Sequence, residues 1–348
     1  MKQEVILSSV SATDAHQHVK MRRQQILTVV GCSLLVLIML SLLLGRYPVW
    51  GLLAPQQLLT DEMAQRLVLH LRLPRVITAV LLGMTLAAAG LTFQTIFANP
   101  LVEPGFLGVS QGAAFGAAFG IVFWQSSLWL VQGLAMGFAF LGLGATYLLA
   151  CRIRYGGWIL RLVLAGIAVS AMFSAGLGIL KYLADPLRQL PEITFWLLGG
   201  LAGITWGRTL SILPMVFLGL SFLLAMRWRL NLLSLNDQVA FSLGSNVQRE
   251  RLLLLIAAVV PTAAVISVAG VVSWVGLIVP HIVRRLVGAV THYAMPLVLL
   301  LGGLFTLICD NIARTVLAGE IPLGILTSLI GAGSFLVLMT QRQSRLQK

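Results

Sequence analysis

Long apolar segments separated by short polar ones recur along almost the whole chain. A helix that crosses the hydrocarbon core of a bilayer needs about 20 mostly apolar residues. The pattern predicts ten such helices, over residues 26–45, 76–98, 108–124, 128–150, 162–183, 209–226, 252–269, 271–287, 294–313 and 321–340. Polar tails are expected at 1–25 and 341–348, on either side of a single transmembrane domain at 26–340. The predicted fold class is an all-α membrane protein.

Two uncharged stretches are long enough for two helices each. Residues 104–151 carry no charge over 48 positions, which corresponds to about 72 Å of helix, and the polar residues around Ser126 mark the break. In the second stretch, 252–283, the basic residues decide. With two helices there, Arg284, Arg285 and the basic C-terminal tail share one side of the membrane, as the positive-inside rule requires. Both termini are therefore expected in the cytoplasm.

Two further patterns bear on how the helices are arranged. The apolar stretch 190–207 is short for a crossing, so it predicts a periplasmic interfacial or re-entrant helix, with Trp196 and Trp206 as aromatic anchors. Within the third predicted helix, glycines recur at every fourth position and predict a face against which another helix packs closely. These glycines are Gly108, Gly112, Gly116 and Gly120.

Composition supports a membrane protein rather than a soluble one. Apolar residues make up 58% of the chain and charged residues 10%, whereas a soluble domain carries about 25% charged residues. The net charge of +13 is spread between apolar segments, so it predicts membrane topology rather than nucleic-acid binding. The three cysteines lie in or beside apolar segments and are expected to pack there, with no disulfide or metal site.

The sequence gives no sign of catalysis by this chain. It contains no Gly-x-x-x-x-Gly-Lys-Ser/Thr loop, so the chain itself is not expected to hydrolyse ATP. It contains no His-Glu-x-x-His motif and no clear serine–histidine–carboxylate set, and no cofactor or metal is expected. An ion-coupled secondary transporter would place carboxylates near the bilayer midplane. Here the acids cluster near helix ends and only Asp310 falls within a predicted helix, which makes that alternative the weaker one.

Several motifs occur in a fixed order between about residues 30 and 340. They are Leu71-Arg72-Leu73-Pro74-Arg75, Asn99-Pro100-Leu101-Val102-Glu103-Pro104-Gly105, the run from Leu107 to Ala113, the run from Val275 to Arg284, and Asp310 and Arg314 followed by the run from Glu320 to Gly324. In this order and spacing the chain resembles the FecCD-type permeases, which import ferric siderophores, haem and vitamin B12. It departs from their pattern at Asn236-Asp237, Ser273-Trp274 and Gly331–Phe335.

The resemblance implies a fold like that of the vitamin B12 importer permease and a role as the membrane subunit of a binding-protein-dependent ABC importer. ATP hydrolysis would then belong to a separate ATP-binding subunit. A periplasmic substrate-binding protein and a second permease copy, identical or related, are the other implied partners. An iron chelate, most commonly a ferric siderophore, is the expected cargo, while haem, cobalamin and oxyanions remain open.

Three basic residues carry the expected contact with the binding protein. Arg72 and Arg75 flank Pro74, which suits the first turn of a helix because its missing N–H is not needed there. The resemblance implies that these two residues and Arg314 bind acidic residues of the periplasmic protein, for which guanidinium groups are well shaped. Two alternatives stay open: the arginines could satisfy lipid headgroups or helix ends, and Asp310 could pair with Arg314 one turn later.

The expected cytoplasmic gate lies at two helix ends. Pro100 disfavours helical geometry at Asn99, so the chain must turn after the second helix. The resemblance implies that Asn99, Pro100 and Leu101 narrow the pathway there, together with Ile159 and Leu160 at the start of the fifth helix. A plain connecting turn is the alternative.

The longest charged loop, 227–251, contains a predicted short amphipathic helix. Asn236 suits its N-cap, Asp237 its first turn and Gly244 its C-terminal stop. Leu235, Val239, Ala240 and Leu243 fall on one face of this helix. The resemblance implies a coupling helix that sits on the ATP-binding subunit through Asn236, Asp237, Ala240, Leu243 and Gly244. A helix lying on the bilayer surface is the alternative.

Overall fold

The computed structural model describes residues 2–45, 51–54, 56, 60–124, 127–235, 237–317 and 319–346, with side chains from residue 19 to residue 340. Helices dominate this part of the chain, and one short antiparallel pair joins β1 to β2 with Leu44 opposite Leu52. The elements are α1 (Lys2–Leu43), β1 (Leu44–Gly45), β2 (Gly51–Leu52), α3 (Glu62–Arg66), η1 (Leu67–Arg72), α4 (Leu73–Ile96), η2 (Pro104–Leu107), α5 (Val109–Trp124), α6 (Leu128–Arg152), α7 (Trp158–Leu183), α8 (Gln189–Leu198), α9 (Trp206–Ala225), α10 (Arg227–Leu232), α11 (Asp237–Ser242), α12 (Val247–Ala269), α13 (Val275–Val287), α14 (Thr291–Thr315) and α15 (Leu323–Leu346).

A helix occupies each of the ten segments predicted to cross the membrane. Among the described residues, eight helices are long and apolar enough to cross by themselves. The other two are shorter: α5 has 16 residues and α13 has 13. At 1.5 Å per residue, α13 is only about 20 Å long, and the non-helical residues 270–274 lead into it from the end of α12. The predicted division of 252–283 into two segments is therefore correct, but the second is a half-helix.

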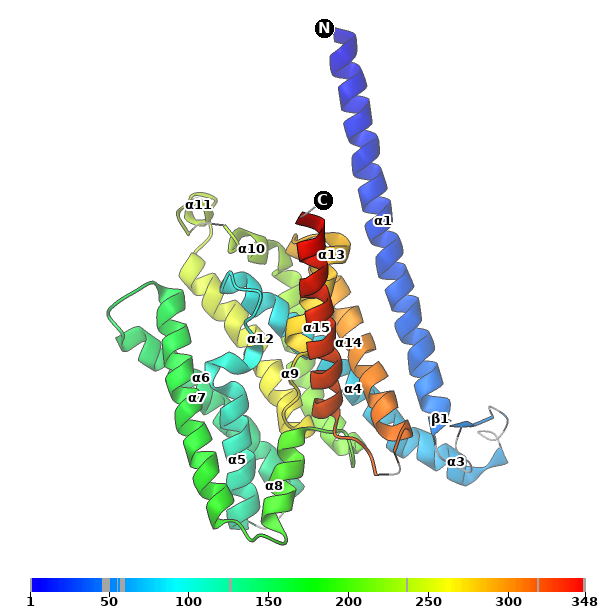
Figure 1. The fold of residues 1–348 in the computed structure, drawn as a ribbon, viewed down its shortest axis with the longest axis vertical. Helices are drawn as coiled ribbons and strands as arrows, with labels where there is room; N and C mark the ends of the chain where they lie inside the picture. Colours follow the sequence, from blue (N-terminus) through cyan, green and yellow to red (C-terminus); the bar gives the residue numbers. More distant parts are fainter. Residues whose placement is uncertain are drawn as a thin grey trace.

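The ends of the bundle match the predicted arrangement of loops. Figure 1 shows both chain ends, α10 and α11 at one end of the molecule, and α3, β1 and α8 at the opposite end. The short helix expected within 190–207 is α8, which begins at Gln189. The helix α1 begins at Lys2, inside the segment expected to be a polar tail, and its first turns project beyond the bundle (Figure 1).

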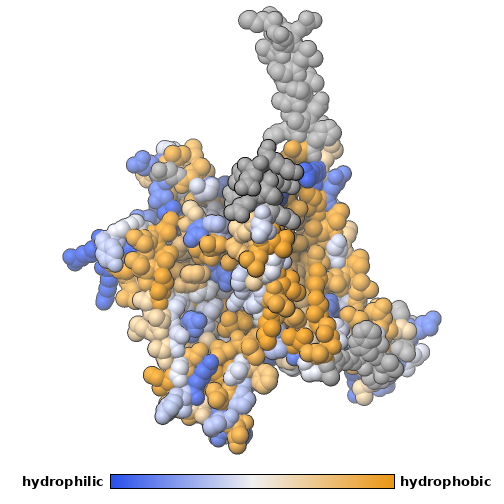
Figure 2. All heavy atoms as spheres, in the orientation of Figure 1, coloured by the Kyte–Doolittle hydropathy of each residue, from blue (hydrophilic) through white to orange (hydrophobic). Residues whose placement is uncertain are grey.

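The helices divide into a buried centre and an exposed periphery. In the most apolar window of each helix, 83% of residues are buried in the α3–α4 helix and 72% in α12, against 11% in α1 and 22% in α15. Exposed side chains of the outer helices are large and apolar, for example Met39 on α1 and Leu329 on α15. On the face shown in Figure 2, hydrophobic residues cover most of the middle of the bundle.

Glycine contacts set the closest helix approaches. A Cβ at Gly90 of α4 would overlap the carbonyl of Gly276 in α13, and one at Gly83 would overlap the carbonyl of Gly302 in α14. The predicted glycine face of α5 packs on α6, because Gly112 and Gly116 meet its backbone in the same way. Missing side chains let helices approach closely enough for dispersion contacts that lipid does not replace. Gly108 differs from the prediction: it precedes α5 and has a left-handed φ of +77°.

Candidate functional site

The three arginines expected at the periplasmic mouth lie at one end of the bundle. Arg72 ends η1, Arg75 is in the first turn of α4, and Arg314 is in the last turn of α14. Pro74 lies in the first turn of α4, as expected, but α4 is not a separate helix, because the helix runs without a break from Glu62 to Ile96. It passes through the proline by way of η1, a π-helical segment.

The π-helical segment changes which carbonyl the proline leaves unpaired. In η1 the N–H of Leu73 donates to the carbonyl of Val68, five residues earlier. The same pattern would pair the next carbonyl, that of Leu69, with an N–H at Pro74, which proline lacks. The indole N–H of Trp206, at the start of α9, donates to Leu69 instead, at 2.8 Å. Trp206 therefore bonds a helix backbone within the protein, in addition to its expected place near the interface.

Arg75 forms the centre of an ion-pair network. Its Nε and Nη2 donate to Oδ1 of Asp310, at 3.0 and 2.9 Å, and its Nη1 donates to both oxygens of Glu320, at 2.8 and 2.9 Å. Asp310 is fully buried, while the side chain of Glu320 is 41% exposed. Arg314 lies farther from Asp310, with Nε 3.9 Å from Oδ2. The principal partner of Asp310 is thus Arg75 on another helix, rather than the neighbour one turn later.

Arg72 and Arg314 hold the C-terminal end of α1. The last carbonyls of a helix have no partner within the helix, and Nη1 of Arg72 donates to two of them, those of Leu42 and Leu43, each at 2.9 Å. Arg314 donates to the carbonyl of Ser41 and, at 2.8 Å, to its hydroxyl. These contacts match the alternative in which the arginines satisfy helix ends.

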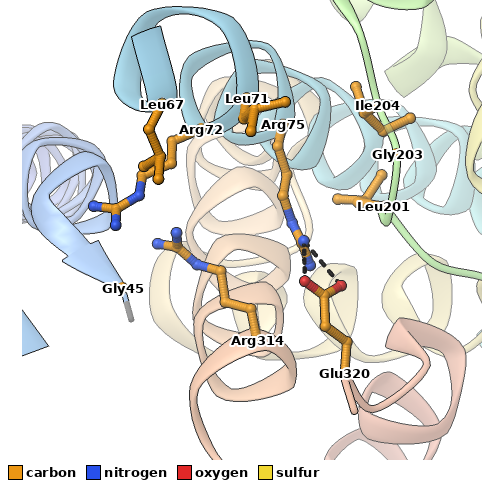
Figure 3. A pocket seen from close by; sticks show the side chains of 10 residues that line it. All are labelled: Gly45, Leu67, Leu71, Arg72, Arg75, Leu201, Gly203, Ile204, Arg314 and Glu320. Carbon is orange, nitrogen blue, oxygen red and sulfur yellow. Dashed lines mark hydrogen bonds and ion pairs between the residues drawn. The ribbon is translucent and has the colours of Figure 1, made fainter. Parts of the chain in front are cut away.

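A cavity opens beside this network. It has a volume of about 410 Å³. Figure 3 shows the three guanidinium groups and the Glu320 carboxylate around it, with Arg75 and Glu320 joined. Three arginines and two carboxylates, Asp310 and Glu320, leave one net positive charge. The cavity is lined by Gly45, Leu67, Leu71, Arg72, Arg75, Leu201, Gly203, Ile204, Arg314 and Glu320. This arrangement suits an anionic group, because unused guanidinium N–H groups are preorganised donors for carboxylates and other oxyanions.

Three of the expected gate residues, Asn99, Pro100 and Leu101, form a tight turn after α4. The side-chain oxygen of Asn99 accepts from the N–H of Leu101 at 2.9 Å, and Ala98 has a left-handed φ of +47°. Leu101 is 51% exposed and Leu160, on α7, 48% exposed, whereas Ile159 is half-buried. Pro100 is exposed within the turn. The gate itself stays a prediction.

The expected coupling helix is α11, and α10 lies just before it. Asp237 begins α11 and pairs with the buried Arg251, at 2.7 Å. Gly244, with a φ of +81°, ends it in a Schellman motif in which the N–H of Ser245 donates to the carbonyl of Ala240. Asn236, the expected N-cap, lies outside the described residues.

The surface of α11 differs from the expected face. Ala240 is fully buried against the chain itself, so it is not available for a close contact with a partner. The exposed apolar side chains on α11 and directly beside it are Leu235, Val239, Phe241 and Leu243. Phe241 is 74% exposed. Phe241 was missed because the helical projection placed it off the apolar face.

Comparison with known proteins decides the family. A model of the FecCD transport family matches residues 33–341. The chain belongs to the FecCD transport family. It is therefore a permease of the ABC importer class, a multi-pass membrane subunit, as the sequence motifs indicate.

Relatives of this FecCD permease match most of its length. The molybdate import system permease protein MolB of Haemophilus influenzae is 38% identical over 89% of this chain and 94% of its own. The hemin transport system permease protein HmuU of Yersinia pestis is 38% identical over 82% and 87%. A probable iron chelatin transport system permease protein of Helicobacter pylori is 38% identical over 78% and 82%.

A solved structure supports the fold. The permease chain of an ABC transporter of the metal-chelate type, in an inward-facing conformation, superposes with a TM-score of 0.85 at 37% identity, and the match covers 91% of this chain and 99% of that one. Part of the site was nevertheless missed from the sequence. Glu320 was read as part of a motif, and its pairing with Arg75, 245 residues away, has no local signal.

Replacing Asp310 with alanine tests the network. Removing one partner of a buried ion pair costs up to about 3–5 kcal/mol, and here Arg75 would keep only its contact with the partly exposed Glu320. We expect Asp310→Ala to lower the thermal unfolding midpoint of the detergent-purified protein markedly. The control is Glu62→Ala, which removes an exposed pair with Arg66 and is expected to cost at most about 1 kcal/mol. Equal shifts for the two variants would contradict this account of the network.

Proposed function

We propose that this FecCD permease imports an iron chelate, with a ferric siderophore as the expected form, across the bacterial inner membrane. The observation that carries the proposal is the match to the iron chelatin and hemin permeases at 38% identity. The solved metal-chelate type transporter, similar over 91% of the chain, supports the same cargo class. The arginine-lined cavity is compatible with this cargo, since many ferric chelates are anionic.

An oxyanion is the second candidate cargo. It is favoured by MolB of Haemophilus influenzae, which matches 89% of the chain at the same 38% identity. The net positive cavity beside Arg72, Arg75 and Arg314 would suit an oxyanion equally well, so the cavity does not separate the two candidates.

Uptake measurements separate the two cargoes. In a strain lacking this gene, we expect import of radiolabelled ferric siderophores to fall to background and to return with the wild-type gene. Molybdate, hemin and cobalamin uptake should stay unchanged. Restored molybdate uptake with unaffected iron uptake would instead establish the oxyanion importer.

The periplasmic binding protein is proposed to dock at the end of the bundle that carries Arg72, Arg75 and Arg314. Support comes from the guanidinium groups around the cavity at that end (Figure 3). Their internal contacts mean that a simple charge reversal would also disturb α1 and α14. A double-mutant cycle avoids this difficulty, because it isolates the interaction between two partners from the effect of each change alone.

The docking cycle pairs Arg72→Gln with reversal of an acidic residue of the binding protein to lysine. Reversal of the paired acid is expected to weaken binding to the wild-type permease by about tenfold or more and to weaken binding to Arg72→Gln much less. Affinity is measured on the purified complex in nanodiscs. Additive losses for every surface acid tested would exclude docking through Arg72.

The ATP-binding subunit is proposed to bind α11 in the cytoplasm, at the end of the bundle that holds both termini. Support comes from the exposed apolar side chains of Val239, Phe241 and Leu243, held by the Asp237–Arg251 pair. ATP hydrolysis then belongs to that subunit, and a second permease copy completes the pathway.

Phe241→Ala tests this contact. Loss of a central aromatic residue typically costs about 2 kcal/mol or more at an interface, so affinity for the ATP-binding subunit should fall by about tenfold or more. Tyr182→Ala is the control, because Tyr182 is 89% exposed near the opposite end of the bundle. Unchanged assembly and ATP hydrolysis in Phe241→Ala would place the contact elsewhere. This result would also remove the support for placing α11 and both termini in the cytoplasm.

A further inference from the structure

The half-helix α13 begins inside the protein, where its first backbone groups have few possible partners. Its Pro280 has no N–H, so the carbonyl of Gly276, four residues earlier, has no donor within the helix. The side chain of Gln94, which is 3% exposed, supplies one: its Nε2 donates to the Gly276 carbonyl at 3.0 Å. Gln94 therefore completes the hydrogen bonding of α13 from the last turns of α4.

A second side chain holds the start of the same helix. Trp274 precedes α13 as its N-cap, and its backbone N–H donates to Oε1 of Glu103 at 2.9 Å. Glu103 belongs to the connection between α4 and α5. A carboxylate at a helix N-terminus also interacts favourably with the helix dipole.

Gln94 and Glu103 stand on either side of the proposed gate turn, Asn99–Leu101. The backbone carbonyl of Gln94 accepts from the N–H of Asn99 at 3.2 Å, while its side chain holds α13. Pro104, the residue after Glu103, lies against Gly276. A shift of the turn relative to α13 would break the Gln94–Gly276 and Glu103–Trp274 hydrogen bonds. It would leave buried backbone groups unpaired, which is unfavourable.

Backbone strain is concentrated at the same place. Among the residues that the structure describes, Ala98 and Trp274 are the non-glycine residues with left-handed φ, +47° and +74°. One is in the gate turn and the other at the start of α13. Such strain persists only where the surrounding contacts enforce it, and here the two strained positions are joined by Gln94 and Glu103.

Trp274 also carries the connection to α15. Its side chain lies against Gly331, and its ring centre is 6.3 Å from that of Phe335. Trp274, which belongs to one departure from the family pattern, thus contacts Gly331 and Phe335, the two ends of the segment that contains another. The large side chain of Trp274 faces Gly331, which has no side chain.

We propose that Gln94 and Glu103 are positioning residues that clamp α13 to the Asn99–Leu101 turn, so that the turn, α13 and α15 move as one unit during transport. This inference rests on the proposed gate but not on the identity of the cargo. Gln94 and Glu103 act through the turn and the half-helix, and they need no contact with cargo.

The clamp is tested in the assembled transporter, with its ATP-binding subunit and binding protein, in nanodiscs. Gln94→Leu removes the donor to Gly276. Its matched control is Gln132→Leu, because Gln132 is 6% exposed and likewise bonds another helix, donating to Ser211 at 2.8 Å. We expect Gln94→Leu to raise the amount of ATP hydrolysed per imported cargo, because the Asn99–Leu101 turn no longer moves with α13. Gln132→Leu should leave this ratio unchanged. Similar ratios for the two variants would overturn the proposal.

A second change distinguishes the clamp from general loss of stability. Pro280→Ala restores the N–H that can bond the Gly276 carbonyl within α13, so it should return Gln94→Leu towards the wild-type ratio. Rescue of this kind is not expected for a residue that only fills space. Failure of Pro280→Ala to improve Gln94→Leu would contradict the assigned role of the Gln94 amide.

Glu103 is tested by the pair Glu103→Ala and Glu103→Gln. Glutamine keeps an oxygen that can accept from the N–H of Trp274, so Glu103→Gln should hydrolyse about as much ATP per imported cargo as the wild type. Glu103→Ala should hydrolyse more, because it has no acceptor. Hydrogen exchange of a peptide spanning 271–279 should quicken about tenfold or more in Glu103→Ala, since a bond to a charged acceptor is lost. Equal defects in both variants would overturn the role of the acceptor.

The exchange measurement also separates this inference from the cargo proposal. It needs no cargo, so it remains valid if the wild-type transporter imports an oxyanion rather than an iron chelate. Faster exchange in Glu103→Ala with an unchanged ratio of ATP to cargo would show a bond that holds α13 without controlling the pathway, and would refute the clamp.

Discussion

The structure depends on one constraint: inside a bilayer every backbone N–H and C=O must find a partner within the protein. Continuous helices meet this requirement by themselves, but in this permease Pro74 and Pro280 remove a backbone donor within a helix, and the chain is irregular around Trp274. At each of these places a side chain from another element supplies the missing partner. Trp206 donates to Leu69, Gln94 donates to Gly276, and Glu103 accepts from Trp274. The irregular segments are therefore also the points at which distant parts of the chain are tied together.

The same requirement explains the arginines at the opposite end from α11. A helix end leaves carbonyls unpaired, and Arg72 and Arg314 satisfy those of α1. Burying these cations is unfavourable unless carboxylates lie close by, which Asp310 and Glu320 do. Because two carboxylates compensate three guanidinium groups, some positive charge is left beside the cavity. The proposed recognition of an anionic partner thus relies on the same residues as structural stability, and neither role excludes the other.

Two pairs of interacting residues could not be connected from the sequence alone. Arg75 and Glu320 are separated by 245 positions, and Glu103 and Trp274 by 171. Hydrophobic periodicity reports which face of a helix is buried, but it carries no information about which polar side chain of another helix completes a broken backbone. Ala240 shows the same limit on a small scale. Its place on an apolar face was correct, but that face packs partly on the chain itself, and Phe241 is the residue left exposed.

Sequence by itself determined the membrane class, the ten hydrophobic segments, the glycine face of α5 and the family, because each depends on composition, local spacing or motif order. Bilayer thickness imposes segment length, so hydropathy is enough to find the helices. Only the tertiary structure decided that α13 is a half-helix, that Pro74 lies within a continuous π-containing helix, and that the arginines bind α1 and α14. These features follow from long-range packing, in which a backbone group that has no local partner, such as the Leu69 carbonyl before Pro74, is paired by a distant helix.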